Sequence, residues 1–407
     1  MTSKPPSDES GTAALPLAGV KIVEIANHLA APTASMYLCD FGADVTKVER
    51  PGDGDELRRW GNSKNGVGLY FKVINRGKKS VTADLHTPIG VEIVKRLVKD
   101  ADVVVENYRV GTLAKWGIDY DVLSAINPRL IMLKVSGFGQ TGPHRNKPGF
   151  GTLAEAYTGY AHISGEADGP PLLPGFGLGD ASTGLMGAFL LMVALHERNA
   201  NGGRGQVIDL GLYETLYTLL GPQVVNYDQL GIVQQRAGSR LPFVAPRNTY
   251  RTRDDKWIAI AGSTQGVFER ICVALEIPEV AADPRFVDNR SRLVHVDALD
   301  DFVQDAVAKL DFADLMHRFD RSDAAVAPVY DVAQTFEDPH FKARENVVAV
   351  SDDDFGQMRM QNVVGKLSRT PGRVRRAGPQ LGQHNRQVLV DQLGFSAAEL
   401  AAAGIIV

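Results

Sequence analysis

The amino-acid sequence predicts an α/β fold, in which a Rossmann-like large domain with a parallel sheet is joined to a smaller α+β domain. Short apolar runs alternate with helical segments over residues 19–139, which is typical of a parallel sheet covered by helices. From about residue 227 the pattern changes to two strands followed by polar helices. A chain of 407 residues also exceeds one ordinary core, since a domain has roughly 100 to 200 residues.

The strands and helices of the large domain follow from hydrophobic patterning. GVKIVEIA predicts a strand, APTASMYLCDFG a helix that ends at a glycine, and ADVTKVER a second strand, which together make a βαβ unit. The same pattern returns in SVTADL, TPIGVEIVKRLVKDA and DVVVENY, and RLIMLKVSGFG adds one more buried strand. Ligands of such sheets bind beyond the carboxyl ends of the strands. We therefore expect the site in the loops rich in Gly, Arg and Lys at 47–60, 105–117 and 135–151.

The smaller domain is predicted from a different pattern of strands and helices. Residues 244–268 read as two strands around an Asp-Asp turn, and FERICVALEI continues as a helix. Residues 283–321 are polar and helical, and the C-terminal part returns to an α/β texture. We therefore expect the C-terminus to rejoin the large domain.

Composition excludes several classes of function. A net charge of -4 argues against general nucleic-acid binding, and the longest apolar run, 184–195, is shorter than the roughly 20 residues that cross a bilayer. Cys39 and Cys272 are far apart and outside any metal-binding spacing, so no disulfide framework or metal site is expected. The polar N-terminus lacks the apolar core of a signal peptide, and a reducing, cytoplasmic location fits these features.

The common catalytic motifs are missing. GFGLGD is not a dinucleotide fingerprint, and HExxH, GxSxG and Walker A patterns do not occur. Attention falls on Asp180 in GLGDASTGLMG, between a pair of glycines and a convincing helix. Asp180 is either the N-cap of that helix or a reagent, and the two roles are compatible, because a helix N-terminus favours an ionised carboxylate by about 0.3 to 1 kcal/mol.

Several segments together resemble one protein family. The chain resembles the class III coenzyme A transferases, a group that also holds formyl-CoA transferases, carnitine-CoA transferases and α-methylacyl-CoA racemases. The likeness runs from about Leu17 to the C-terminus and is carried by residues 19–54, NRGKKSVTADLHTPIG, residues 102–131, GLGDASTG, GGRGQVIDLGLYE and APVYDVAQTFEDPHF.

The resemblance implies covalent chemistry at Asp180. Asp180 matches the aspartate that attacks an acyl-CoA thioester, so that a mixed anhydride forms first and an aspartyl-CoA thioester second. An ionised carboxylate needs no separate base, which accounts for the missing triads. The CoA thioester is then a substrate, and no tightly bound cofactor or metal is implied.

The resemblance also implies binding residues. Those expected to contact CoA are His28, Ala30, Arg50, His86, Asn107, Tyr108 and Lys115. Those expected around the acyl group are Trp60, Phe150 and Gly179. His86 stands where relatives have a lysine. Arg50 and Lys115 suit CoA phosphates, although both could equally be solvated surface charges.

Departures from the family pattern bear on the reaction. Leu29 replaces a glutamine of the formyl-CoA branch, and the glycine tetrad of that branch is not evident, which disfavours formyl or oxalate substrates. The alternative racemase needs a second base, yet Phe150 and Gly151 replace the histidine and aspartate of that branch, and Gln265 stands near its supporting glutamate. Glu155 is either a helix-surface residue or a group near the acyl pocket. A non-catalytic CoA-binding paralogue is the other alternative.

Organisation and partners follow from the same resemblance. Family members form interlocked homodimers, so we expect one here, with no nucleic-acid or membrane partner. Succinyl-CoA is the expected donor and a small dicarboxylic acid the expected acceptor, with Arg145, Lys147 or Arg247 facing the second carboxylate. The predicted division is a disordered lead-in at 1–15, a large CoA-binding domain at 16–200 and 331–407, a linker at 201–226 and a small domain at 227–330.

Overall fold

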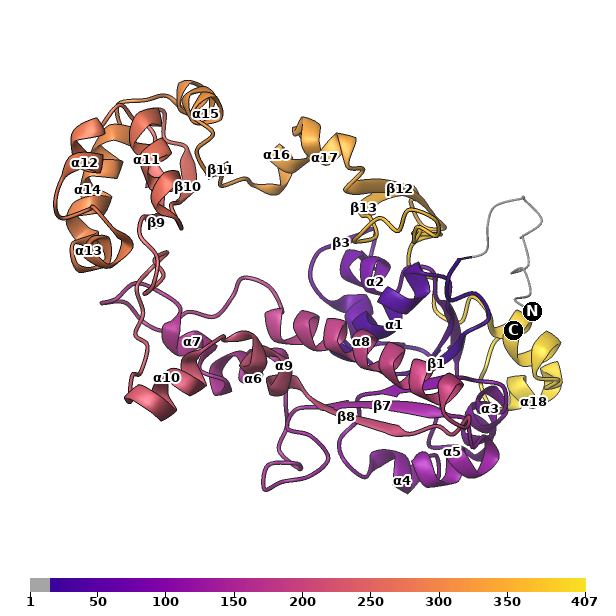
Figure 1. Ribbon diagram of the computed structural model, residues 1–407. Helices are drawn as coiled ribbons and strands as arrows, with labels where there is room; N and C mark the ends of the chain where they lie inside the picture. The colour runs from indigo at the N-terminus through magenta and orange to yellow at the C-terminus, as the bar shows by residue number, and fades with distance from the viewer. Residues whose placement is uncertain (1–14) are drawn as a thin grey trace. The chain divides into compact units, whose positions relative to one another are not determined.

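The chain forms two compact units. The computed structural model describes residues 15–407, so the predicted lead-in lies, apart from residue 15, outside the described residues. Unit 1 contains the described chain up to Tyr160, together with Leu173–Pro222 and His340–Val407. Unit 2 contains Ala161–Leu172 and Gln223–Pro339. Figure 1 labels the elements of both units.

Unit 1 is built on a six-stranded sheet in which every pair of neighbours is parallel. The spatial order is β5-β2-β1-β6-β7-β8. The strands are β1 (Lys21–Ile25), β2 (Asp44–Glu49), β5 (Lys79–Thr82), β6 (Val103–Glu106), β7 (Ile131–Ser136) and β8 (Val207–Gly211). The chain proceeds outward from β1 to one edge and then from β6 to the other. The topological switch point of the sheet therefore lies between β1 and β6.

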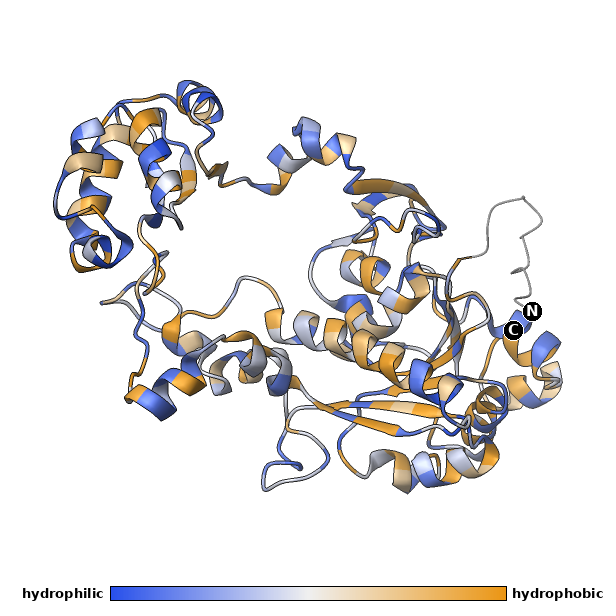
Figure 2. Cartoon of the chain, in the orientation of Figure 1, coloured by the Kyte–Doolittle hydropathy of each residue, from blue (hydrophilic) through white to orange (hydrophobic). Residues whose placement is uncertain are grey.

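Helices cover both faces of this sheet, as the parallel strands require. Val103 and Val105 belong to the core on one face and Val104 to the core on the other, and all three are fully buried. Figure 2 shows hydrophobic residues along the strands. The first face carries α1 (Ala30–Asp40) and α8 (Leu178–Ala200). The second carries α3 (Pro88–Val98), α4 (Thr112–Trp116), α5 (Tyr120–Ile126), the π-helix η2 (Arg386–Gln392) and α18 (Ala397–Ala402).

Shorter elements complete unit 1. Two of them, α6 (Gly151–Tyr157) and α9 (Leu212–Leu219), pack against α8. The others are η1 (Glu56–Arg59), β3 (Ser63–Lys64), β4 (Val67–Gly68), α2 (Leu69–Ile74), β12 (Val347–Asp352) and β13 (Gly356–Gln361); α7 (Tyr160–Ile163) and α17 (Pro339–Ala343) begin or end at the border with unit 2.

Unit 2 has its own core. Tyr250, Ile258 and Phe268 are among its buried side chains. Its antiparallel sheet has the order β11-β10-β9, made of β9 (Arg247–Arg251), β10 (Trp257–Ala261) and β11 (Val326–Pro328). Its helices are α10 (Gln223–Leu230), α11 (Gln265–Ala274), α12 (Pro278–Ala282), α13 (Asn289–Val294), α14 (Val296–Val307), α15 (Phe312–Arg321) and α16 (Val332–Glu337).

The structure differs from the predicted linker at 201–226. Val207–Gly211 is the edge strand β8, which pairs in parallel with β7. The strand buries Leu210, and α9 after it buries Leu212 and Leu216. This stretch therefore belongs to unit 1, because burial of these leucines fixes it against the sheet and α8. Residues 161–172, predicted in the large domain, belong to unit 2.

Helix α8 is long and apolar. Among the described residues it alone meets the length and hydropathy of a membrane span, and half of its most apolar stretch is buried within the protein. Its buried glycines explain a close approach to α1, since a Cβ at Gly184 would lie 2.6 Å from Cβ of Thr33. This packing is that of a core helix of unit 1.

A charged network lies inside unit 1, under the loops that follow β1 and β2. Lys47 Nζ and Lys78 Nζ each lie 2.8 Å from a Glu24 carboxylate oxygen, and Lys47 Nζ also lies 2.8 Å from Asp55 Oδ2. None of these four side chains is exposed. Burial alone raises the pKa of Glu24, but the two ammonium groups outweigh it and hold the pKa at about 2.

Removing the central charge should destabilise the protein strongly. We expect Glu24→Gln to lower the free energy of unfolding by roughly 3 to 5 kcal/mol, because two buried ammonium groups lose their shared partner. Chemical denaturation measures the difference. The control, Asp100→Asn, breaks an exposed 4.0 Å pair with Lys21 and should change stability by less than about 1 kcal/mol. Equal effects of the two variants would contradict this account.

Candidate active site

A cavity of about 310 Å³ opens at the switch point of the sheet. Its walls come from residues 27–30 after β1, residues 107–110 after β6 and residues 135–137 at the end of β7. The other lining residues are Glu56, Arg145, Lys147, Pro148, Gly149, Phe150, Asp180 and Leu212. A parallel sheet places its ligand at this point because neighbouring strands lead their loops in opposite directions there.

A second cavity of about 190 Å³ lies beside the first. The two share Asn27, Glu56 and Tyr108 as lining residues. The second is also lined by Arg50 and by the loop 83–86, which follow β2 and β5, and by Trp116. Together the cavities offer space for an extended ligand along the carboxyl ends of five strands, β5, β2, β1, β6 and β7.

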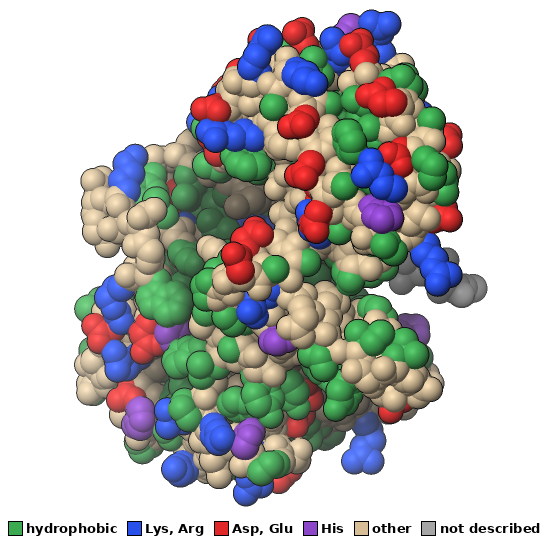
Figure 3. All heavy atoms as spheres, turned by 90° about the vertical axis from the view of Figure 1, so that its left-hand side faces the viewer, with side chains coloured by type: hydrophobic (Ala, Val, Ile, Leu, Met, Phe, Trp, Pro, Cys, Tyr) green, Lys and Arg blue, Asp and Glu red, His purple; other side chains and the backbone are tan. Residues whose placement is uncertain are grey.

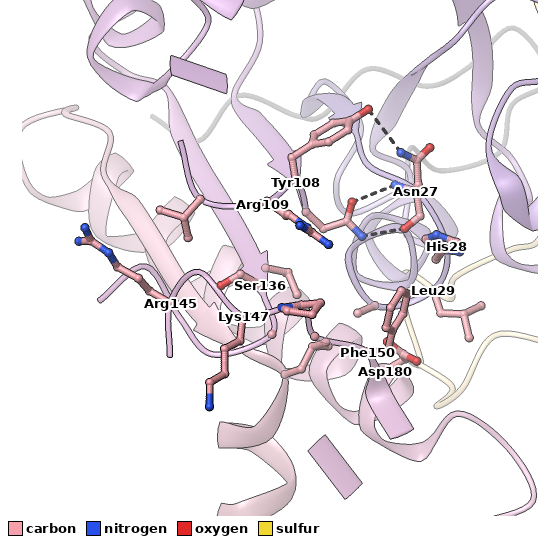
Figure 4. A pocket seen from close by; sticks show the side chains of 18 of the residues that line it. Asn27, His28, Leu29, Tyr108, Arg109, Ser136, Arg145, Lys147, Phe150 and Asp180 are labelled. Atoms are coloured by element: carbon pink, nitrogen blue, oxygen red, sulfur yellow. Dashed lines mark hydrogen bonds between the residues drawn. The ribbon is translucent and has the colours of Figure 1, made fainter. Parts of the chain in front are cut away.

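Hydrogen bonds join the loops after β1 and β6. The Asn27 N–H donates to Asn107 Oδ1 at 2.9 Å, and Asn107 Nδ2 donates to Asn27 O at 2.7 Å. Asn27 Nδ2 also donates to the Tyr108 hydroxyl at 3.3 Å (Figure 4). These reciprocal bonds fix the two loops against each other at the wall of the cavity.

His28 has a constrained backbone. Its φ of 62° lies in the left-handed region, which a non-glycine residue rarely adopts. The buried Asp55 accepts a hydrogen bond from the His28 N–H at 3.0 Å, and Glu56 lies 2.7 Å from His28 Nε2. The centroid of the imidazole lies 5.1 Å from that of the Trp60 ring and 6.2 Å from that of the Phe150 ring. The buried ionic network therefore reaches the cavity through Asp55.

Asp180 is not the cap of its helix. Helix α8 begins at Leu178, its N-cap is Gly177, and Asp180 is the third helical residue. The interpretation of Asp180 as an N-cap is therefore wrong, because the helix begins earlier than its apolar stretch indicates. Because Asp180 lies in the first turn, its carboxylate is close to the positive end of the helix dipole. Asp180 also lines the cavity.

The surroundings of Asp180 disfavour its charge. Burial, and next the negative charge of Glu155, raise the pKa of Asp180 to about 6. Within residues 15–407 no cation or hydrogen bond offsets these two effects. Asp180 is therefore ionised at neutral pH but poorly stabilised, which makes it a more basic nucleophile than an ordinary aspartate.

Glycines allow the Asp180 carboxylate its position. A Cβ at Gly151 would lie 2.7 Å from Asp180 Cγ, and a Cβ at Gly177 would lie 3.4 Å from Asp180 Oδ2. Gly151 opens helix α6, so the carboxylate is packed against the start of that helix. In the sequence Gly151 stands out only as a departure from the racemase pattern, whereas in the structure it leaves space for the Asp180 carboxylate.

The structure brings together most, but not all, of the residues expected to bind CoA or substrate. His28, Ala30, Asn107, Tyr108 and Phe150 line the first cavity with Asp180, and Arg50, His86 and Tyr108 line the second. The remaining three lie elsewhere. Lys115 is exposed, the Trp60 ring lies 5.1 Å from that of His28, and neither residue lines these two cavities. Gly179 is buried, and its N–H donates to Glu155.

Three cations line the first cavity: Arg109, Arg145 and Lys147. Figure 4 shows the side chains of Arg145 and Lys147 extending away from Asp180. Arg247 belongs to unit 2, where its guanidinium donates to the carbonyl of Ser239. Sequence reasoning missed Arg109, although it directly follows Asn107 and Tyr108. In the described part of the chain no three His, Cys, Asp or Glu side chains form a group that could hold a metal ion.

A crevice at the switch point of a parallel sheet, with a destabilised carboxylate at a helix start, defines an α/β protein equipped for acyl chemistry on an extended ligand. Residues 17–385 match the model of CoA-transferase family III, and the chain belongs to this family of enzymes. The resemblance found in the sequence is thus confirmed. As a CoA-transferase, the protein uses CoA thioesters as substrates.

Relatives and solved structures agree with this assignment. The chain is 43% identical over 387 residues to succinyl-CoA–D-citramalate CoA-transferase of Chloroflexus aurantiacus, over 95% of this chain and 96% of the relative. It is 42% identical over 388 residues to the beta subunit of succinyl-CoA–L-malate CoA-transferase of the same organism, over 94% and 96%. A CAIB/BAIF family protein from Brucella suis has the same fold, with a TM-score of 0.83, 35% identity and coverage of 93% of this chain and 99% of that chain.

Filling the space beside Asp180 should lower activity strongly without unfolding the protein. We expect Gly151→Ala to lower the transfer rate on the order of 100-fold, because the added Cβ displaces the carboxylate. Gly175→Ala is the control, since a Cβ there meets no atom within 4 Å. Steady-state kinetics with circular dichroism tests this, and full activity of Gly151→Ala would contradict the inferred position of Asp180.

Proposed function

We propose that the protein transfers coenzyme A from succinyl-CoA to a small dicarboxylic acid through covalent intermediates on Asp180. The observation that carries the proposal is the Asp180 carboxylate, which lines the switch-point cavity with its pKa raised to about 6. Such a group is an anion at neutral pH and still a good nucleophile. Two relatives are named as transferases between succinyl-CoA and citramalate or malate, and these names support the choice of donor and acceptor.

The first half of the proposed reaction moves CoA onto the enzyme. An Asp180 carboxylate oxygen attacks the thioester carbonyl, the C–S bond breaks, and CoA leaves as its thiolate while a succinyl-aspartyl anhydride remains. The thiolate then attacks Cγ of Asp180, the bond from Cγ to the bridging oxygen breaks, and succinate leaves as a carboxylate. Asp180 now carries CoA as a thioester.

The second half repeats these steps in reverse with the acceptor. Its carboxylate attacks Cγ of Asp180, CoA thiolate leaves, and a new mixed anhydride forms. The thiolate attacks the acceptor carbonyl, the new acyl-CoA forms, and the Asp180 carboxylate is restored. Every nucleophile is already an anion and no net proton transfer occurs, so no general base is needed.

The two adjoining cavities suit an extended CoA chain. We place the thioester end in the first cavity beside Asp180 and the nucleotide end in the second, where Arg50 offers a cation and the Trp116 ring a surface for stacking. The reciprocal bonds between Asn27 and Asn107 hold the wall that both cavities share. Lys115, which lines neither cavity, is not part of this proposal.

The acceptor brings negative charge to an anionic nucleophile. Arg109, Arg145 and Lys147 line the cavity that holds Asp180, and their charges offset the repulsion between acceptor, donor and enzyme. A dicarboxylic acid uses one carboxylate for attack and leaves the other for such a cation. Racemisation is less well supported, since Phe150 and Gly151 stand where that reaction requires a second base.

One assay tests the reaction. The protein is mixed with succinyl-CoA and a panel of free acids, citramalate and malate included, in heavy water. We expect new CoA thioesters by mass spectrometry, and a loss of at least about 10³-fold in Asp180→Asn, because the nucleophile is gone. The exposed Asp168→Asn is the matched control. Deuterium at the α-carbon without exchange would overturn the proposal in favour of racemisation, and neither signal would favour a non-catalytic CoA binder.

We also propose a homodimer. Side chains of α8 and α10 expose apolar surface, among them Phe189, Met192, Val225 and Tyr227. A largely apolar hollow of about 360 Å³ lies beside Phe189, with Leu17 and Phe41 among its lining residues. On the face drawn in Figure 3, hydrophobic side chains gather in the lower half. Exposed apolar patches of this kind are typical of surfaces that associate.

Light scattering tests the assembly. We expect the mass of two chains, retained on dilution, because burial of the apolar surface stabilises the pair. Phe189→Glu, which places a charge beside the hollow, should shift the population toward the monomer. His196→Glu, at an exposed position further along α8, should not. A wild-type protein with the mass of one chain would contradict the dimer.

A further inference from the structure

Glu155 is a buried carboxylate that the proposed reaction does not use. It lies on α6, only 2% of its surface is exposed, and its Oε1 accepts a hydrogen bond from the Gly179 N–H at 2.9 Å. The first N–H groups of a helix lack partners within the helix, and the N-cap of α8, Gly177, has no side chain to satisfy them. Glu155 therefore caps α8 from a neighbouring helix.

Capping alone does not require a negative charge. A glutamine at this position would offer the same acceptor oxygen without placing a second carboxylate near Asp180. Burying a charge beside another of the same sign is unfavourable, so such a pair calls for a role beyond the cap.

Acylation supplies that role. The free Asp180 carboxylate is an anion, whereas its anhydride and its CoA thioester are neutral at that position. The repulsion from Glu155 is present before acylation and relieved after it. A charge on Glu155 therefore favours the covalent intermediates over the free enzyme, in the same sense as it raises the pKa of Asp180.

We propose that Glu155 is a positioning residue of the transfer reaction, whose carboxylate holds the first turn of α8 and directs its negative charge at Asp180 so that acylation is favoured. The inference rests on the proposed role of Asp180 as nucleophile. It concerns a residue for which the sequence left two interpretations open, and it assigns Glu155 to the acyl side of the site.

Other charged groups around Asp180 bear on its titration. Tyr70 on α2 faces it closely enough that burial, and next the charge of Asp180, raise the pKa of the Tyr70 hydroxyl. The remaining charged or titratable groups that line the same cavity are His28, Glu56, Tyr108, Arg109, Arg145 and Lys147. Only Glu155 adds a charge effect to burial in raising the pKa of Asp180.

The substitution Glu155→Gln separates charge from capping, because the amide oxygen still accepts the Gly179 N–H. Wild-type activity should fall as the pH drops through about 6, since Asp180 must be ionised to attack. In Glu155→Gln we expect this acid limb to move down by about 1 pH unit. The amount of acylated enzyme at equilibrium with succinyl-CoA, measured by intact-protein mass spectrometry, should fall about tenfold.

Three further variants make the outcome decisive. Glu155→Ala removes the cap as well and should also lower the melting temperature, whereas Glu155→Asp keeps the charge and should keep the limb near that of wild type. Glu197→Gln, an exposed position on α8, removes the same charge without touching the site and should change nothing. An unshifted limb and unchanged acylation in a folded Glu155→Gln variant would overturn the proposal.

A measurement on the wild type needs no Glu155 variant. Carboxyl ¹³C titration, with Asp180→Asn to assign the signal, should show Asp180 titrating near pH 6. A single ordinary step near 3.8 would overturn the role of Glu155. Transfer activity that survives in Asp180→Asn would instead overturn the proposed function, so the two failures are distinguishable.

Discussion

The arrangement of the active site depends on a small group of charges buried in unit 1. Glu24 on β1 lies between Lys47 and Lys78, and Lys47 also pairs with Asp55. Charges withdrawn from water are tolerable only when each has its partner at short range, so the segments that carry them have little freedom to move. Asp55 also fixes the loop after β1, because its carboxylate accepts a hydrogen bond from the His28 N–H. This bond stabilises the left-handed backbone conformation of His28, which a non-glycine residue rarely adopts.

The carboxylate of Asp180 has surroundings opposite to those of Glu24. Glu24 is surrounded by cations and its pKa is lowered to about 2, whereas Asp180 has burial and a like charge, and its pKa is raised to about 6. A carboxylate that is well paired is inert. The same chain thus contains one carboxylate whose charge stabilises the fold and another whose charge is destabilised by its surroundings. A destabilised charge suits the nucleophile that we propose, because Asp180 would lose its charge on acylation.

The sequence predicts the parallel sheet well, because apolar strands such as β1 and β6 are buried on both faces and stand out from their polar neighbours. The family is also recognisable from the sequence, and the family match confirms it, whereas the role of Asp180 that the resemblance implies stays a prediction. The sequence does not predict where α8 begins, since Gly177 gives no capping signal. It leaves the position of Glu155 open, because the face that a short helix such as α6 buries is decided by packing against α8. The sequence also does not predict strand β8, because the strand is short and partly polar and only its last two residues are buried.

The balance of charges explains why both kinds of carboxylate are needed around one reaction. In the proposed reaction donor, acceptor and CoA are all anions, and the cation Arg109 lines the cavity in which we place them. A cation directly at Asp180 would lower its pKa, weaken it as a nucleophile and stabilise the free enzyme against acylation. Figure 4 shows Arg145 and Lys147 extending away from Asp180, and the charge that raises the pKa of Asp180, after burial, is that of Glu155. In the reaction that we propose, the groups that attract the substrates are thus separate from the group that activates the nucleophile, and each effect is favourable without cancelling the other.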